Sequence, residues 1–402
     1  MGSTSHYQTY SFIPEKYHVN SYSLTPILKA LPTLESFATP LFILHRSRQT
    51  MRLRILLTAC FLLISLGIFA QSGTLSINRS IPFDTNWLFV KDSTIRAERP
   101  DYADASWRKV ELPHDWSIED LPNQVPDQVA GPFARSSIGG HSTGFAVGGT
   151  GWYRKRFITG KDQQNKRITI HFDGVYMNAD VWLNGQHLGF HPYGYTPFYY
   201  DLTPYLKPAG QENVLAVRVR NEGKNSRWYS GSGIYRHVWL TATGPVHLAP
   251  WGVFVTTPEV SESSATVQVQ ALVMNEHPSQ STITVTTTLQ APDGTTAGRA
   301  QHTLVLQENA SATDTQTLTL PNPQLWSMES PHLYKVITEI SIGTQLLDHV
   351  ETPVGIRSIR FSSTEGFVLN GKRVLLKGGC IHHDNGPLGA AAIDRAEERK
   401  IE

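Results

Sequence analysis

Apolar and polar residues alternate with a period of two over many short segments between residues 74 and 245. This is the pattern of strands that bury one face in a sheet. Two examples are "RITIHFDGV" and "ADVWLNGQHLGF", in a region rich in Gly, Pro and Asn-Gly turns. Asn184-Gly185 predicts a two-residue hairpin turn, because both turn residues need a positive φ that Asn and Gly tolerate. No useful length of this region has a helical period, so we predict an antiparallel sandwich.

A second block, residues 246–357, is rich in Thr, Val and Ser and alternates in the same way. Its clearest segments are "ATVQVQALVMN", "STITVTTTLQ" and "HLYKVITEISIG", and the turn sequence Pro292-Asp293-Gly294 follows the second of them. Four or more strands at such short intervals predict a smaller, immunoglobulin-like sandwich. The two blocks are not obvious sequence repeats of one another.

The pattern changes again in residues 358–402. A hairpin is predicted around Asn370-Gly371, followed by a short buried strand at Val374–Lys377 and then a helix that has Asp394 as its cap or first-turn acid. Strand, loop and helix form the opening unit of an α/β fold. We expect the segment beyond Lys377 to fray, because a lone strand and a partial helix lack neighbours to bury their faces.

The start of the chain has a different composition. Residues 51–70 contain two arginines, then an apolar run, then Ala70, which is the order of regions in a secretory signal peptide. We therefore predict a secreted or periplasmic protein without a membrane anchor after cleavage. Residues 1–50 match neither a domain nor a targeting signal, and we interpret them as a spurious extension of the reading frame. A transmembrane helix and a lipidated Cys60 are the alternatives, but the apolar run is short for a span and mostly follows the cysteine.

Composition narrows the function classes. The 402 residues include 35 Lys and Arg against 34 Asp and Glu, a formal charge of +1, so no basic excess indicates binding to nucleic acid. Charged residues make up only 17% of the chain, which favours a β-rich protein over a helical bundle. With Cys60 removed by cleavage, Cys380 is the one remaining cysteine, and no intramolecular disulfide is predicted.

Three stretches carry candidate chemistry. "KGGCIHHDNGPLG" places Cys380, His382, His383 and Asp384 within five positions, which are zinc-ligand residue types. Neighbouring histidines on an extended loop point in opposite directions, however, so a sugar-binding loop and a simple solvated loop both remain open. "NSRWYSGSGIYRHVW" suits either sugar binding or a sandwich core. In "LPHDWSIED" we interpret the His-Asp pair as a structural corner, because no Ser or Cys nucleophile is indicated beside it.

Taken together, the motifs resemble glycoside hydrolase family 2, and are most similar to its secreted β-galactosidases. The motifs that carry the resemblance are, in order, "DASWRKVELPHDWSIE", "GGTGWYRKRF", "DVWLNGQHLGFHPYGYTPFYYDLT", "SRWYSGSGIYRHVWL", "LWSMESPHLYKV", "GIRSIRF" and "FVLNGKRVLLKGGCIHHDNGPLGAA". The resemblance implies a jelly-roll sandwich, an immunoglobulin-like sandwich, and the first part of a (β/α)8 barrel that is incomplete here. It leaves β-glucuronidase and β-mannosidase specificity open as alternatives, as well as a non-catalytic carbohydrate-binding or interaction protein.

The same resemblance implies a retaining mechanism with two glutamates on later barrel strands. A barrel takes on the order of 250 residues, so both glutamates are expected beyond Glu402 and no catalytic residue is assigned in this chain. Asn221-Glu222 and Asn275-Glu276 lie in the sandwiches and are not assigned that role.

The residues that the resemblance implies for substrate binding are Arg227, Trp228, His382, His383 and Asp384. The partner it implies is a β-galactoside oligosaccharide or polysaccharide, with homo-oligomerisation left open. No cofactor or metal is predicted in this chain. Members of the family sometimes carry a divalent ion or sodium, whose acidic ligands would lie mostly beyond Glu402.

Overall fold

The computed structural model describes residues 79–402, apart from residues 126 and 225–228. The predicted extension and signal peptide lie outside the described residues, and so do Arg227 and Trp228. Within the described part, no helix has the length and apolarity needed to cross a bilayer.

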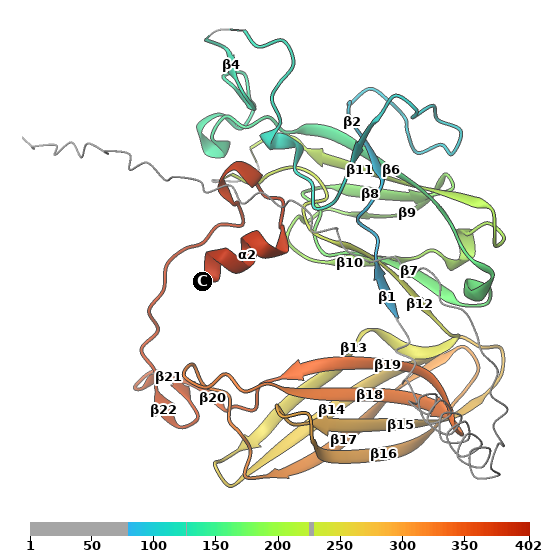
Figure 1. The fold of residues 1–402 in the computed structure, drawn as a ribbon, viewed down its shortest axis with the longest axis vertical. Helices are drawn as coiled ribbons and strands as arrows, with labels where there is room; N and C mark the ends of the chain where they lie inside the picture. The colour runs from blue at the N-terminus through green and yellow to red at the C-terminus, as the bar shows by residue number, and fades with distance from the viewer. Residues whose placement is uncertain (1–78, 126, 225–228) are drawn as a thin grey trace, which may run out of the picture. The chain divides into compact units, whose positions relative to one another are not determined.

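Residues 80–243 form the first sandwich (Figure 1), whose paired strands are all antiparallel. One sheet has the order β1 (Ser80–Pro82), β12 (Val238–Thr243), β7 (Arg167–Phe172) and β10 (Phe198–Asp201). The other has the order β3 (Arg108–Val110), β2 (Trp87–Lys91), β6 (Gly149–Ile158), β11 (Glu212–Asn221), β8 (Ala179–Leu183) and β9 (Gln186–His191). The inward residues of both sheets, such as Ile170, Phe172 and Val217, are fully buried in one core.

The loops of this sandwich contain short elements. They are η2 (Trp116–Ile118), the small hairpin of β4 (Val129–Ala130) and β5 (Phe133–Ala134), η3 (Gly140–Thr143), η4 (Lys161–Gln163) and η5 (Thr203–Tyr205). The predicted turn between β8 and β9 is confirmed. Asn184 and Gly185 have φ angles of 52° and 86°, and Leu183 pairs with Gln186 across the turn.

Residues 246–354 form the second sandwich, which again is antiparallel. One sheet has the order β13 (Val246–Val260), β14 (Ser264–Asn275) and β17 (Ala310–Pro321). The other has the order β16 (Thr296–Leu306), β15 (Ser281–Gln290), β18 (Tyr334–Ile342) and β19 (Gln345–Val354). Alternate residues such as Val267, Val269 and Val336 are buried between the sheets. The predicted immunoglobulin-like sandwich and the mainly β fold class are therefore confirmed.

Residues 356–402 begin with a small sheet of β20 (Ile359–Ser362), β21 (Gly366–Leu369) and β22 (Lys372–Arg373). The predicted hairpin is confirmed, with φ angles of 48° at Asn370 and 76° at Gly371. The strand predicted at Val374–Lys377 is wrong: this segment has no regular structure, and Leu375 and Leu376 are exposed. An apolar strand of this kind needs a continuous ladder to satisfy its backbone. Here the amide of Val374 donates to the carbonyl of Phe367 on β21, and the described residues do not continue the ladder beyond it.

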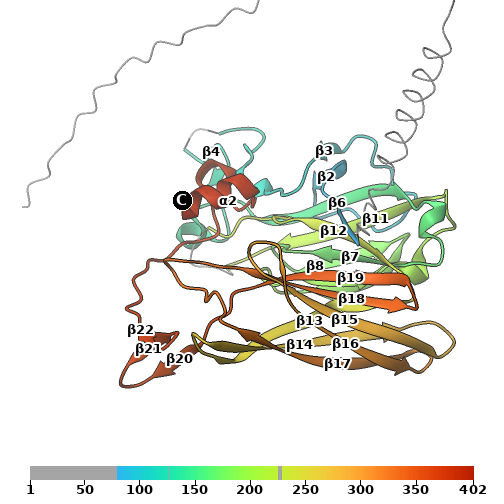
Figure 2. The same ribbon diagram turned by 60° about the horizontal axis from the view of Figure 1, so that its bottom comes forward.

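The chain then forms η6 (Gly386–Leu388) and α2 (Asp394–Ile401). The predicted helix is confirmed, with Asp394 as a first-turn acid and Ile393 at the N-cap. In both views α2 lies beside the loops of the first sandwich (Figures 1 and 2). The expectation that this segment has no neighbours is corrected for its second half, since Ala390 and Ala391 are buried and the amide of Ala392 donates to the carbonyl of Tyr235.

Candidate functional site

A single buried carboxylate joins three distant segments of the chain. Asp115, only 2% exposed, precedes η2 and accepts four hydrogen bonds. Its Oδ1 accepts from the amides of Ser117 at 2.9 Å and Ser232 at 2.8 Å. Its Oδ2 accepts from the Tyr229 hydroxyl at 2.5 Å and the amide of Ala390 at 2.9 Å. A buried carboxylate with four donors is well satisfied, so Asp115 holds these segments together.

Its neighbour His114 is also held by structural contacts. Nδ1 lies 2.7 Å from the Tyr153 hydroxyl, and Nε2 lies 2.9 Å from Oε1 of Glu119. The nearby hydroxyl of Ser117 donates to Ser232 Oγ at 2.6 Å rather than to a histidine. The interpretation of the His-Asp pair as a structural corner is therefore confirmed.

His383 is packed against the first sandwich. Its Nε2–H donates to the carbonyl of Ser230 at 2.7 Å. The ring centroid lies 6.4 Å from that of Tyr176, 5.3 Å from Tyr195 and 5.7 Å from Tyr235. Burial among these rings lowers the pKa of His383, which favours the neutral imidazole. The structure thus directs the ring of His383 to a backbone carbonyl and an aromatic cluster.

The two other residues of the motif lie on either side of His383. His382 is exposed, whereas Asp384 is half-buried, as His383 is. Cys380 is an exposed free thiol. Among the residues that the structure describes, no three His, Cys, Asp or Glu side chains come together in a metal-binding geometry.

The loop that contains Arg227 and Trp228 is fixed at both ends by the described residues. Before it, the side-chain amide Nδ2 of Asn221 donates to the carbonyl of Gly231 at 2.7 Å and to Ser232 Oγ at 2.8 Å. After it, Tyr229 binds Asp115, and Ser230 accepts from His383. Burial, together with the charge of Asp115, raises the pKa of Tyr229 strongly, so its phenol stays protonated and keeps donating.

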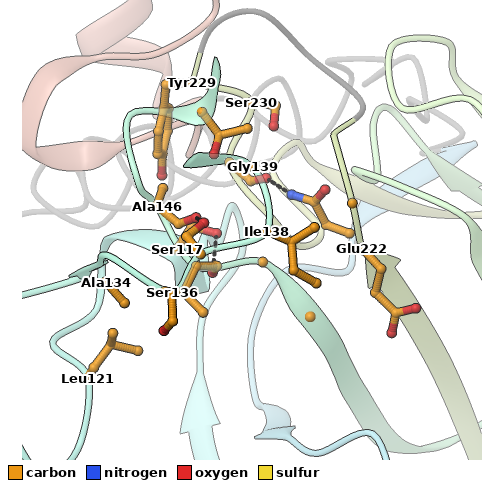
Figure 3. A pocket seen from close by; sticks show the side chains of 18 of the residues that line it. Ser117, Leu121, Ala134, Ser136, Ile138, Gly139, Ala146, Glu222, Tyr229 and Ser230 are labelled. Carbon is orange, nitrogen blue, oxygen red and sulfur yellow. Dashed lines mark hydrogen bonds between the residues drawn. The ribbon is translucent and has the colours of Figure 1, made fainter. Parts of the chain in front are cut away.

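Next to this loop lies a pocket of about 470 Å³. Loop residues 117–149 form one part of its wall, and residues 221–223 and 229–231 form the other. Tyr229 and Ser230 lie along one side, and Glu222 extends away from them on another (Figure 3). Glu222 accepts from Thr150 Oγ1 at 2.6 Å, and Glu276 pairs with Arg167 at 2.8 Å. Glu222 and Glu276, the glutamates of the two Asn-Glu pairs, are therefore bound to side chains of the sandwiches.

Sequence reasoning did not find this pocket or the role of Asp115. The lining is mostly Gly, Ser and Ala, which carry no chemical signature in sequence. The partners of Asp115 lie up to 275 residues away, and no local pattern could have identified them. The cluster of tyrosines in "HPYGYTPFYY" and "GSGIYRHVW" was the available signal for the His383 environment.

Two family models match almost all of the two sandwiches. Residues 84–244 match the sugar binding domain of glycosyl hydrolases family 2, and residues 246–357 match the model described as glycosyl hydrolases family 2. The chain belongs to glycoside hydrolase family 2. The family 2 resemblance and the predicted jelly-roll and immunoglobulin-like sandwiches are thereby confirmed.

The family 2 chain is similar to several larger proteins. It is 41% identical to a β-galactosidase of Bacteroides ovatus, over 84% of this chain and 38% of that protein. It is 36% identical to a putative β-glucuronidase of Formosa agariphila, over 83% of this chain and 30% of that protein. A crystal structure of a family 2 member from Bacteroides cellulosilyticus matches with a TM-score of 0.77 at 44% identity, covering 80% of this chain and 41% of that one. The family 2 chain therefore spans between 30% and 41% of the length of these proteins, and the part it spans is their N-terminal part.

Proposed function

We propose that this chain is the N-terminal portion of a secreted, retaining β-galactosidase-like enzyme, and that it supplies the substrate-binding rim of that enzyme. The supporting observation is the docking of the "CIHHDNG" loop on the first sandwich. Asp115 and Ser230 accept hydrogen bonds from Ala390 and His383, respectively, across more than 150 residues of sequence. The loop thereby lies next to Tyr229 and Ser230.

This arrangement suits positioning of a sugar. In the proposal, His382 and Asp384 contact sugar hydroxyls, and Arg227 and Trp228 supply further contacts, as the family resemblance implies. His383 has its Nε2–H engaged with Ser230, so it orients the loop and leaves hydroxyl contacts to its two neighbours. Holding polar groups in fixed geometry before the substrate arrives lowers the entropic cost of binding.

A β-galactoside is favoured over a β-glucuronide as the substrate. The relative at 41% identity is a β-galactosidase, and the one at 36% is a putative β-glucuronidase. The described rim also carries the carboxylate of Asp384, which would repel the carboxylate of a glucuronide. Polymeric or oligomeric β-galactosides are the substrate class in the proposal.

The chemical step requires groups that we place beyond Glu402. Retaining hydrolysis needs one carboxylic acid to protonate the leaving oxygen and one carboxylate to attack from the opposite face. Asp384 alone cannot fill both positions. We therefore expect this chain by itself to be inactive toward β-galactosides.

The test is to read the frame that follows the codon for Glu402 and to express its full product. The full product should hydrolyse a chromogenic β-galactoside faster than the matching β-glucuronide, whereas residues 79–402 alone should hydrolyse neither. A stop codon followed by unrelated sequence, with sugar binding but no turnover, would instead support a non-catalytic carbohydrate-binding protein. Turnover by residues 79–402 that is lost in Asp384→Ala would place the catalytic carboxylates within this chain and contradict the proposal.

A further inference from the structure

A row of aromatic side chains crosses the outer face of the sheet formed by β10, β7 and β12. Tyr199 pairs with His171, and His171 pairs with Trp239, so the three lie side by side at one register. The residues next to them in sequence point the other way, into the core, as Phe172 and Val238 show. The rings of His171 and Tyr199 are stacked, with centroids 5.3 Å apart and planes 23° apart.

Trp251, on β13, stands upright beside this row. Its ring lies 5.2 Å from that of Tyr199 at 77°, and 5.7 Å from that of His171 at 86°. Trp251 thus stands at right angles to the stacked rings of His171 and Tyr199. Trp251 is 61% exposed and Tyr199 is 41% exposed, which is unusual for rings held in so defined a geometry.

His171, Trp239 and Trp251 line a pocket of about 430 Å³, whereas Tyr199 lies outside its lining. The lining also includes Asp173, whose Oδ2 accepts from the indole N–H of Trp239 at 2.8 Å. Within the part of the chain that the structure describes, Oδ1 of Asp173 and the Trp251 indole N–H make no hydrogen bond to protein. A donor and an acceptor therefore lie beside the aromatic side chains of this pocket.

The charges of this pocket favour a neutral ligand. Arg79 is paired with the buried Asp348 at 3.0 Å. Burial and the nearby Arg79 lower the pKa of His171 to about 4, so the imidazole is neutral at neutral pH. Among the described residues that line the pocket, Asp173 keeps an unpaired negative charge, which disfavours an acidic sugar.

We propose that His171, Trp239 and Trp251, which line this pocket, form a binding subsite for a neutral pyranose. An apolar face of the sugar packs against these rings, and its hydroxyls bond to Asp173 and to the indole N–H of Trp251. The match of residues 84–244 to a sugar binding domain supports a carbohydrate occupant over a protein one, because two of these rings and Asp173 fall in that range. The proposal adds a second sugar contact to the proposed function, and it stands whether or not the chain is part of a hydrolase.

The test is NMR titration of residues 79–402 with methyl β-D-galactopyranoside and, in parallel, with methyl β-D-glucuronide. We expect the indole N–H resonance of Trp251 to shift saturably with the neutral sugar at millimolar concentration, and to shift less with the glucuronide. Followed through the indole N–H resonance of Trp239, which also lines the pocket, Trp251→Ala should weaken binding on the order of tenfold, because a stacked ring contributes at least that much. Trp251→Phe, which keeps a ring, should weaken binding less.

Phe254→Ala is the matched control. Phe254 lies on the same strand β13, is also 61% exposed, and is not in the pocket lining. It should leave the sugar titration unchanged, and the circular dichroism spectra of all variants should be alike. Binding that survives Trp251→Ala, or no binding at all, would overturn the proposal. So would a wild-type dimer that Trp251→Ala dissociates, since the face would then be a protein interface. None of these outcomes depends on whether the full product hydrolyses β-galactosides.

Discussion

Oδ2 of Asp115 accepts a hydrogen bond from the backbone amide of Ala390, 275 residues further along the chain. The same oxygen accepts from the Tyr229 hydroxyl, and Oδ1 serves two more backbone amides. One side chain thus connects the corner before η2, the loop after residues 225–228 and the segment before α2. The predictions that follow test how far the C-terminal segment depends on this connection.

Asp115→Ala should destabilise the first sandwich and release the C-terminal segment. Removing the carboxylate leaves three buried amides without an acceptor, which should lower the free energy of unfolding by about 3–5 kcal/mol. Urea denaturation measures the stability, and amide exchange at Ala390 reports the release. Asp120→Ala removes an exposed acid of the same loop and should have little effect. Equal stability of the two variants would contradict the assigned role of Asp115.

Gly389→Ala should displace the segment before α2, whereas Gly386→Ala should not. Both glycines have a positive φ, of 59° and 55°. A Cβ on Gly389 would lie 2.3 Å from Ile118 and 2.4 Å from Asp115 Oδ2, while one on Gly386 meets nothing within 4 Å. A positive φ strains alanine at both positions, and the clash with Ile118 and Asp115 arises only at Gly389. Amide exchange at Ala392 separates the two, and equal protection in both variants would show that the close contact with Asp115 is unimportant.

Docking of α2 should weaken as pH rises. His237 lies 2.7 Å from Asp84 through Nδ1 and 3.0 Å from Asp394 through Nε2, and both contacts are hydrogen bonds when the ring is protonated. Burial lowers the pKa of His237, but the hydrogen bonds to Asp394 and Asp84 outweigh it, so the pKa is raised. A raised folded-state pKa means that this stabilisation is complete below the unfolded value of 6.5 and is lost as pH rises through the folded value.

Protection factors for the first turn of α2, measured across this pH range, test the prediction. Asp394→Asn should reduce the pH dependence, because the exposed carboxylate that favours the protonated ring is gone. Protection that is independent of pH in the unmodified chain would contradict a role for the His237 charge.

Stability of the first sandwich should fall in acid through His171. Its pKa is about 4 in the folded chain against an ordinary value of 6.5 for histidine, because the ring is buried and lies near Arg79. Between these two pH values the unfolded chain therefore binds a proton at His171 that the folded chain does not bind. The contribution of His171 to the free energy of unfolding is complete above pH 6.5 and is lost as pH falls toward 4. The loss from this one residue is up to about 3 kcal/mol.

His171→Gln cannot take up that proton and should flatten the decline in the free energy of unfolding over the same range. The comparison is made by urea denaturation at several pH values. A decline as steep in the variant as in the unmodified chain would assign the acid sensitivity to other groups, such as His247, whose pKa burial also lowers.

The sequence by itself determined many of the strands, two hairpins and the family. Alternation with a period of two placed β7, β8, β14 and β15, and the Asn-Gly pairs placed two hairpin turns, because both signals depend on residues a few positions apart. The sequence also placed α2, although not its docking site.

Only the tertiary structure decided which segments far apart in the sequence pair or form hydrogen bonds with one another. Val374–Lys377 has the composition of a strand, but in the described chain its pairing with β21 ends at the Val374 amide, so the segment stays irregular. The four donors of Asp115 and the row of Tyr199, His171 and Trp239 depend on the register between strands that are far apart in sequence. That register is set by how the buried faces pack into a common core, which local patterns of apolar residues cannot specify.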